Sequence, residues 1–184
     1  VREIMGIEDP YREVKRRHNQ VALGLLPELQ EIVCNSPDPL KTAMFVAIRG
    51  NVIDLGANTG LTEDELRPSG TGSISAPLRI NIEKLRREIE RASSILYLAD
   101  NAGEIVFDRL LIERLPLERV TVAVRGAPVI NDALVEDAQT AGLDRIVRVV
   151  GNGSDAPGTI LEDCNPEFRW YYKAADLVIA KGQG

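Results

Sequence analysis

The chain has 184 residues, of which 44% are apolar, and 22 basic against 28 acidic residues give a formal net charge of −6. An acidic chain has no surplus of lysine and arginine to displace the counterions of a nucleic acid, so we expect no nucleic-acid partner. No apolar run is long enough to cross a bilayer and no charged-then-apolar leader opens the chain, so we expect a cytoplasmic protein with no membrane partner. Cys34 and Cys164 belong to no Cys/His cluster and fit a reducing compartment, where lone cysteines behave as small buried apolar groups.

The first part of the chain predicts two helices and a long connection. An Asp-Pro pair at residues 9–10 starts one helical pattern that runs to residue 31, and a second pair at 38–39 starts another. The first helix carries a basic stretch that we expect to be a solvated face, formed by Arg12, Lys15, Arg16 and Arg17. Residues 51–76 are rich in Gly, Ser, Thr and Asp and predict a long irregular segment.

From residue 77 onward, short apolar strands alternate with helices. Helices are expected at 82–92, 104–115, 132–141 and 158–174, and strands at 94–99, 120–124, 146–150 and 176–180. Strands that read as continuous apolar runs, each separated from the next by a helix, indicate a parallel sheet covered on both faces. The sequence therefore predicts an α/β fold in which a helical region and long loop (1–76) precede a three-layer α/β/α, Rossmann-like domain (77–184).

Polar, glycine-rich segments follow all four predicted strands. In chain order they read DNAGE at 100–104, RGAPVIND at 125–132, GNGSDAPGT at 151–159 and KGQG at 181–184. Each of them alone is compatible with ordinary turns. Ligands bind at the carboxyl ends of the strands in an open parallel sheet, so we expect a functional site along this edge.

The candidate metal ligands are Asp100, Asn101 and Asp132. Two carboxylates and an amide oxygen are hard ligands that suit Mg²⁺ or Mn²⁺. A purely structural alternative is that Asp100–Asn101 and Asp132 cap the helices that follow them. Glu104 has two interpretations as well, either a partner of the helix dipole or a group that orients a water molecule. The residues alone leave these alternatives open.

The turn at 151–158 is a candidate phosphate cradle. Its backbone N–H groups at a helix entrance favour anions, and Ser154 and Thr159 add hydroxyl donors. The turn does not match the dinucleotide motif, since it follows the third strand and contains Pro157. Lys181 places a positive charge at the same edge, although a surface lysine is the alternative. A metal, anion-binding turns and a lysine together indicate phosphoryl transfer or hydrolysis.

Residues 52–60, VIDLGANTG, match a competing pattern. An apolar strand that enters an Asp-x-Gly-x-x-x-Gly turn is typical of S-adenosylmethionine-dependent methyltransferases. The context fits poorly, because the preceding segment reads as a helix that ends at Gly50 and no long amphipathic helix follows. A methyltransferase is therefore the second interpretation.

The segments together resemble the damage-control phosphatases, formerly the domain-of-unknown-function 89 family, and in particular its prokaryotic branch. The matching segments are DPYREVKRRHNQ, GNVIDLGA, LADNAGEIVFD, VRGAPVINDA, GNGSDAPGT and AKGQG. Their order and spacing are more specific than any single segment, and LADNAGEIVFD is the strongest of them.

The resemblance implies a helical region packed on a three-layer domain, with Mn²⁺, Co²⁺, Ni²⁺ or Mg²⁺ bound at the strand ends. It implies hydrolysis of phosphate monoesters, so the expected partner is a small phosphorylated metabolite such as a sugar phosphate. The family's metal ligands, its lysine and its GN-x-x-D segment fall on Asp100, Asn101 and Asp132, on Lys181, and on Asn51 and Asp54.

Our mechanistic hypothesis assigns a role to each of these groups. The metal polarises the phosphoryl group, Lys181 and the backbone around Gly153 neutralise its other oxygens, and Glu104 or Asp54 orients the attacking water. Asn51 and Ser154 complete the expected substrate contacts. Direct attack by Asp100 is a poorer alternative, because its carboxylate is committed to the metal.

The chain departs from the family pattern at both ends. Prokaryotic relatives have paired cysteines in an N-terminal region, and the family continues past AKGQG with an Asn, a strand and a helix. The chain opens at Val1 without an initiator methionine. We therefore expect that the helical region (1–76) is truncated at its N-terminus, and from the family pattern that the α/β domain (77–184) is truncated at its C-terminus. Two rival functions stay open: a carboxyl methyltransferase, an activity also attributed to eukaryotic relatives, and a non-catalytic metal- or metabolite-binding domain. The sequence does not determine the oligomeric state.

Overall fold

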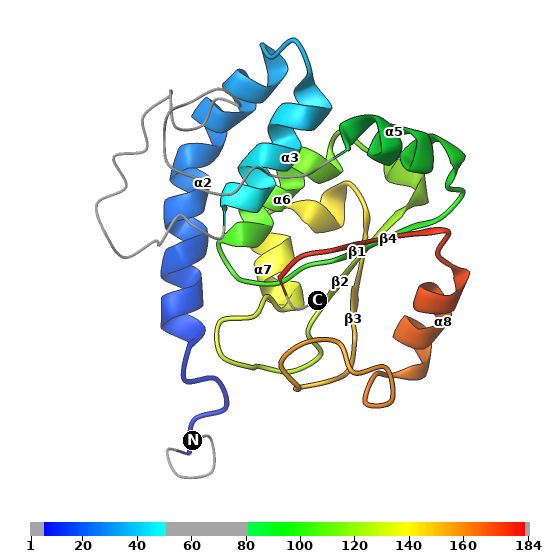
Figure 1. The fold of residues 1–184 in the computed structure, drawn as a ribbon. Helices are drawn as coiled ribbons and strands as arrows, with labels where there is room; N and C mark the ends of the chain where they lie inside the picture. Colours follow the sequence, from blue (N-terminus) through cyan, green and yellow to red (C-terminus); the bar gives the residue numbers. More distant parts are fainter. Residues whose placement is uncertain (1–5, 51–80, 183–184) are drawn as a thin grey trace.

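The computed structural model describes residues 6–50 and 81–182, which form a parallel sheet with helices on both faces (Figure 1). The predicted three-layer α/β/α fold is confirmed. The helices are α2 (Arg12–Cys34), α3 (Pro39–Arg49), α5 (Ile82–Arg91), α6 (Glu104–Ile112), α7 (Val135–Thr140) and α8 (Pro166–Ala174). The strands are β1 (Ile95–Leu98), β2 (Val120–Val124), β3 (Arg148–Gly151) and β4 (Leu177–Ala180), and short 3₁₀ turns at Leu117–Arg119 and Leu143–Arg145 lead into β2 and β3.

The strand order β3-β2-β1-β4 creates a topological switch point between β1 and β4. The chain moves outward from β1 through β2 to β3, and then returns to pair β4 with the other side of β1. Because the crossovers are right-handed, α6 and α7 cover one face while α8, which precedes the returning strand, covers the other (Figure 1). Ligands in such sheets bind where the direction reverses, at the carboxyl ends of the strands. Here that point lies just after β1 and β4.

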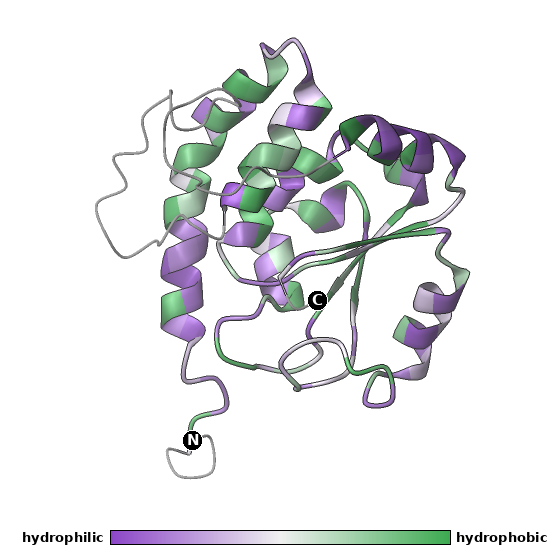
Figure 2. Ribbon diagram, viewed as in Figure 1, coloured by the Kyte–Doolittle hydropathy of each residue, from purple (hydrophilic) through white to green (hydrophobic). Residues whose placement is uncertain are grey.

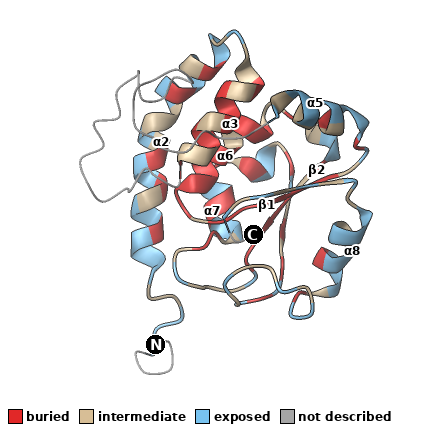
Figure 3. Ribbon diagram, viewed as in Figure 1, coloured by how far each residue is buried: buried red, intermediate tan, exposed pale blue. Residues whose placement is uncertain are grey.

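The two faces of the sheet are covered unequally. On one face, alternate residues of β1 and β2 join a large apolar cluster with α2, α3, α5, α6 and α7. On the other face, a smaller cluster forms around Phe168 of α8 and Cys164. Figures 2 and 3 show apolar, buried residues concentrated in α3, α6 and the strands β1 and β2, while α5 and α8 are more hydrophilic and less buried. The central strand β1 is therefore buried on both of its faces.

The start of α3 follows the local capping rule, whereas α2 begins without a side-chain cap. Asp38 accepts a hydrogen bond from the backbone N–H of Lys41 at 3.1 Å, and Pro39 occupies the first turn of α3, as the Asp-Pro signal predicts. The first helix begins at Arg12, three residues after Asp9 of its Asp-Pro pair.

The prediction that the basic stretch is a solvated face is wrong for Lys15, which is only 1% exposed and pairs with Asp9 at 2.6 Å. A charge is buried only when a partner compensates it, and Asp9 supplies that partner.

Two other predictions about local structure need correction. The helix expected at 132–141 begins at Val135, and the helical material expected at 158–174 is restricted to α8. Cys164 is buried as expected, whereas Cys34 is exposed, so only one cysteine behaves as a buried apolar group. Among the described residues, no helix combines the length and hydropathy that a membrane span requires.

Candidate functional site

The turn after β1 brings acidic side chains into the interior. Asp100 and Glu104 are 9% and 4% exposed. Gly103 adopts φ +83°, a conformation that favours glycine, and helix α6 begins directly after it without a side-chain cap. Capping of α6 by Asp100 or Asn101 was the structural alternative for this pair, and the geometry contradicts it. Neither side chain is used as a cap of α6.

A single antiparallel bridge joins this turn to the one after β2. Asn101 and Asp132 pair across the bridge, where the Ala133 N–H donates to the Asp100 carbonyl at 2.8 Å. Helix α7 begins only after Leu134, so Asp132 does not cap it. The bridge thus holds Asp100, Asn101 and Asp132, which the sequence places on separate turns, at one edge of the sheet.

Hydrogen bonds fix the orientation of the Asn101 amide. Its Nδ2 donates to Asp100 Oδ2 at 2.9 Å and to Glu104 Oε1 at 2.7 Å. Since both partners are acceptors, the NH₂ group faces them and the amide oxygen faces away. That oxygen is the atom which would ligate a hard cation.

The charge balance at this edge favours a cation. Burial raises the pKa of Asp100 to about 6, and the negative charges of Glu104 and Asp132 add to the effect. Arg125 and Lys181 oppose the shift without reversing it. The described residues contain no cluster of three or more His, Cys, Asp or Glu side chains arranged around a metal, so a site here depends on the Asn101 oxygen as a third ligand. Two carboxylates and an amide oxygen fit Mg²⁺ or Mn²⁺ better than a soft metal.

Lys181 lies beneath the acidic edge. Its Nζ donates to the Ala47 carbonyl at 2.8 Å, to Asp108 Oδ1 at 3.0 Å and to Glu104 Oε2 at 3.2 Å. Burial alone would lower the pKa of Lys181, but the charges of Asp108 and Glu104 outweigh it and the pKa is raised. The alternative of a surface lysine is wrong, because the side chain is only 12% exposed. All three ammonium protons have protein partners, so Lys181 can contact a phosphate only if it gives up one of these hydrogen bonds. The contact with phosphate stays a prediction.

Gly182 brings backbone into direct contact with Asp100. A Cβ placed on Gly182 would overlap the Asp100 carboxyl group, and its φ of +54° also favours glycine. The end of strand β4 therefore lies directly against the turn that follows β1. The Lys181 N–H donates to the Leu98 carbonyl at 3.0 Å.

Arg125 is a site residue that the sequence analysis did not single out. It is 3% exposed, its Nε donates to Asp132 Oδ2 at 2.6 Å, and its Nη1 donates to Thr159 Oγ1 at 3.1 Å. Its buried Nη2 has no hydrogen-bond partner among the described residues. The signal was its position, the first residue after a buried strand on the edge where ligands bind.

The turn at 151–158 uses its polar groups internally. Asn152 Oδ1 accepts from the N–H groups of Gly126 and Ser154, each at 2.9 Å, and Ser154 Oγ accepts from the Ala156 N–H at 3.0 Å. A Cβ on Gly126 would overlap the backbone of Gly153, so the glycines here permit two turns to touch. Gly153 is exposed and Ser154 is buried. Their predicted contacts with substrate remain predictions.

Part of the predicted site lies outside the described residues. Asn51 and Asp54 fall within 51–80, as does the methyltransferase-like segment at 52–60. Of the predicted site residues that the structure describes, Asp100, Asn101, Glu104, Asp132 and Lys181 form one connected cluster, and Gly153 and Ser154 belong to the neighbouring turn.

The fold and this cluster define an α/β domain with a candidate cation site at its switch point. The model of the family "Damage-control phosphatase ARMT1-like domain" matches residues 1–184. The chain belongs to this family, which confirms the resemblance inferred from its motifs.

Relatives from archaea support the same assignment. The chain is 42% identical over 99% of its length to a damage-control phosphatase of Archaeoglobus fulgidus, and 33% identical over 99% to a damage-control phosphatase of Pyrococcus horikoshii. A crystal structure of a DUF89 family protein from Pyrococcus horikoshii matches with a TM-score of 0.80 at 33% identity, covering 99% of this chain and 64% of that one. The chain spans 64% and 63% of the two named relatives.

Proposed function

We propose that this chain forms the metal-binding part of a phosphatase that hydrolyses phosphate monoesters of small metabolites such as sugar phosphates. The observation that carries the proposal is the backbone bridge that places Asp100, Asn101 and Asp132 on two adjoining turns at the carboxyl ends of β1 and β2, where burial and the charges of Glu104 and Asp132 raise the pKa of Asp100. The relatives named as damage-control phosphatases support the reaction class. The proposed setting is the cytoplasm.

Asp100, Asn101 Oδ1 and Asp132 would hold Mn²⁺, Co²⁺, Ni²⁺ or Mg²⁺. When bound, such an ion supplies Lewis acidity at a phosphoryl oxygen. The surrounding hydrogen bonds prepare the ligands: Glu104 helps to orient the amide of Asn101, and Arg125 occupies one oxygen of Asp132 and leaves the other for a ligand. Outer partners of this kind fix the direction of the atoms that bind a metal.

Glu104 is better suited to positioning than to direct contact with water. One of its oxygens accepts from Asn101 and the other from Lys181. It orients a water molecule only if one of these bonds is exchanged when substrate binds. Asp54, the other candidate for that role, lies outside the described residues.

Arg125 is the strongest candidate among the described residues for a contact with the phosphate group. It is buried at the acidic edge and keeps one hydrogen-bond donor, Nη2, without a described partner. A guanidinium N–H forms a charge-assisted hydrogen bond with a phosphate oxygen. Lys181, Gly153, Ser154 and Asn51 remain the other proposed contacts.

The decisive experiment is a screen of phosphometabolites against Mn²⁺, Co²⁺, Ni²⁺ and Mg²⁺, repeated with Asp100→Ala and Asp132→Ala. We expect hydrolysis that requires a metal, and its loss in both variants because each removes one ligand. Far-ultraviolet circular dichroism verifies that the variants fold. Full activity in either variant would remove the proposed site.

The rival functions give different results in the same screen. A methyltransferase binds S-adenosylmethionine without metal, and calorimetry with that ligand detects it. A non-catalytic domain binds metal but turns over none of the phosphate esters.

A further inference from the structure

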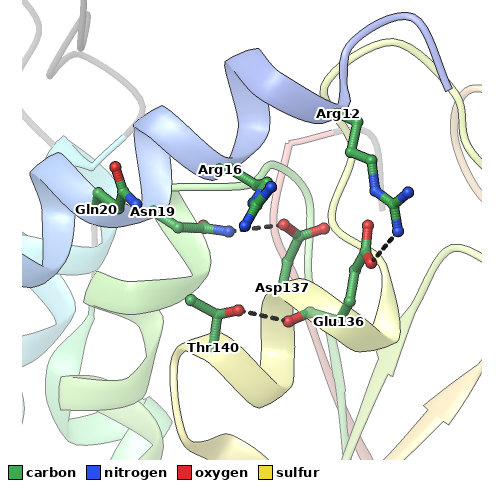
Figure 4. A pocket seen from close by; sticks show the side chains of 7 residues that line it. All are labelled: Arg12, Arg16, Asn19, Gln20, Glu136, Asp137 and Thr140. Atoms are coloured by element: carbon green, nitrogen blue, oxygen red, sulfur yellow. Dashed lines mark hydrogen bonds and ion pairs between the residues drawn. The ribbon is translucent and has the colours of Figure 1, made fainter.

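A groove of about 490 Å³ separates the start of α2 from α7 (Figure 4). Figure 4 shows Arg12, Arg16 and Gln20 on the α2 side and Glu136, Asp137 and Thr140 on the α7 side, with Asn19 directed across toward Asp137. Arg12 pairs with Glu136 at 3.2 Å, and both side chains are exposed. Asn19 differs from this surface pair, since it is only 2% exposed.

Asn19 connects two distant parts of the chain. Its Oδ1 accepts from the Gly103 N–H at 2.7 Å, and its Nδ2 donates to Asp137 Oδ1 at 2.7 Å. The two bonds fix the orientation of the amide, because one partner is a donor and the other an acceptor. The Gly103 N–H stands at the start of α6, where backbone donors have no partner inside the helix. Asn19 therefore satisfies a group that nothing within α6 reaches.

Both partners of Asn19 lie close to the candidate metal ligands. Gly103 belongs to the turn that carries Asp100 and Asn101. Asp137 accepts from the Leu134 N–H at 2.8 Å and thereby holds the end of the turn that carries Asp132. One buried side chain on α2 is thus linked to both ligand-bearing turns.

We propose that Asn19 is a positioning residue that sets the relative placement of the two turns and thereby the affinity for the divalent cation. The inference rests on the proposed metal site. An ordinary buried asparagine would instead affect only the stability of the fold. The two cases separate when metal affinity and unfolding are measured on the same variants.

Exchanging the two side chains provides a test that preserves the hydrogen bonds. Asn19→Asp alone sets two carboxylates against each other without a donor between them. Asp137→Asn alone introduces an NH₂ group that faces a donor, either Asn19 Nδ2 or the Leu134 N–H. In the double variant, the carboxylate at position 19 accepts from Gly103 and from the new amide, whose oxygen accepts from Leu134. All three hydrogen bonds can form again.

The probe is Mn²⁺ alone, titrated by calorimetry, with metal-free thermal unfolding measured in parallel. Each single variant should bind Mn²⁺ more weakly by about tenfold, the lower end of the loss that follows changes to the direct partners of metal ligands. The double variant should return to within roughly threefold of the unaltered protein, because coupled residues restore each other's losses.

Arg109→Gln is the matched control. Arg109 of α6 donates to the Ala141 carbonyl, just after α7, at 3.0 Å. It therefore connects α6 and α7 at the ends remote from the candidate site. This variant should lower the unfolding temperature and leave Mn²⁺ affinity within about twofold, since it alters no partner of the ligand-bearing turns.

Three results would overturn the proposal, and each is distinct. Single variants with unaltered Mn²⁺ affinity show that Asn19 does not position the turns. A double variant that folds but binds as weakly as the singles shows that the hydrogen-bond exchange is irrelevant. Absence of Mn²⁺ binding in the unaltered protein removes the metal site itself, and with it the proposed function. Mn²⁺ binding without hydrolysis of any ester overturns the phosphatase while leaving the role of Asn19 intact.

Discussion

Two glycine-rich turns at the same edge of the sheet have similar composition and different architecture. The turn at 100–104 combines Asp, Asn, Gly and Glu, and the turn at 151–158 combines Gly, Asn, Ser and Asp. In the first, Asp100 and Glu104 are buried together and the pKa of Asp100 is raised to about 6. In the second, Asn152 and Ser154 satisfy backbone groups of their own and the adjacent turn. Similar residues thus form a cluster of buried carboxylates in one case and side-chain bonds to backbone N–H groups in the other.

The difference shows that a candidate site and a structural turn can be told apart by the partners of their polar side chains. Buried charge without full compensation is costly unless a ligand balances it. A turn whose donors and acceptors are paired internally has little left for a ligand. Substitutions in the two turns and outside them test this contrast.

Gly182→Ala and Gly126→Ala should have different consequences. Both place a methyl group where none fits, against Asp100 in the first case and against the backbone of Gly153 in the second. Overpacking costs about 1–3 kcal/mol, and we expect each variant to lose stability of this order. Only Gly182→Ala should also weaken Mn²⁺ binding, because it displaces Asp100. Thermal unfolding and calorimetry measure the two effects, and equal losses of Mn²⁺ affinity would erase the distinction between the turns.

Arg125→Lys should impair catalysis more than folding. A lysine keeps the charge but cannot hold Asp132 and Thr159 together, as Arg125 does. Hydrogen bonds to charged groups contribute about 1.5–3 kcal/mol, which corresponds to a fall of roughly 10–100-fold in kcat/KM. Steady-state kinetics on the best phosphate ester gives the value. An unchanged kcat/KM would show that Arg125 does not contact substrate or control Asp132.

Ser154→Ala should affect stability and leave turnover nearly unchanged. The hydroxyl accepts from the Ala156 N–H at 3.0 Å within its own turn. Loss of such a bond lowers the free energy of unfolding by about 0.5–1.5 kcal/mol. Chemical denaturation measures this loss. A large rise in KM without destabilisation would instead support the sequence-based prediction that Ser154 binds phosphate.

Arg86→Gln calibrates a half-buried charge pair that belongs to neither turn. A hydrogen bond from Arg86 lowers the pKa of Asp38. The Arg86 Nη2 and Asp38 Oδ1 atoms lie 2.6 Å apart. A lowered carboxyl pKa gives stability that is present above the unfolded-state value of about 3.9 and is lost as pH falls through the folded-state pKa. At neutral pH the variant should lose less than about 1 kcal/mol, as surface pairs do. The loss in free energy of unfolding should become smaller when denaturation is repeated at acidic pH or in high salt. A loss that stays the same under both conditions would show that Arg86 stabilises the fold through packing.

The fold was largely predictable from the sequence because its signals are local. Val120–Val124 was predicted with its observed bounds, since a buried parallel strand is a continuous apolar run. The start of α3 followed from Asp38 and Pro39 alone. The start of α7 was misplaced because Asp132 enters a bridge with Asn101, and pairing between distant segments leaves no local pattern.

The proximity of the predicted ligands was predictable from the sequence, whereas the directions of the surrounding side chains were not. The rule for ligands at strand ends selected Asp100, Asn101 and Asp132 correctly as neighbours. It gave no indication that Arg125 binds Asp132, or that Lys15 is buried against Asp9. Each of these facts depends on how a long side chain is directed in three dimensions, which residue spacing does not determine.

The anchoring of Lys181 has a consequence for the order of assembly. Glu104 and Asp108 lie one turn apart on α6, and Lys181, near the end of the chain, donates to both. Until β4 joins the sheet, two acidic groups in the apolar interior lack this counter-ion, and at neutral pH each must stay hydrated or take up a proton. The packing of α6 on the sheet therefore reaches its full stability only after β4 has joined β1 and brought Lys181 to the two carboxylates.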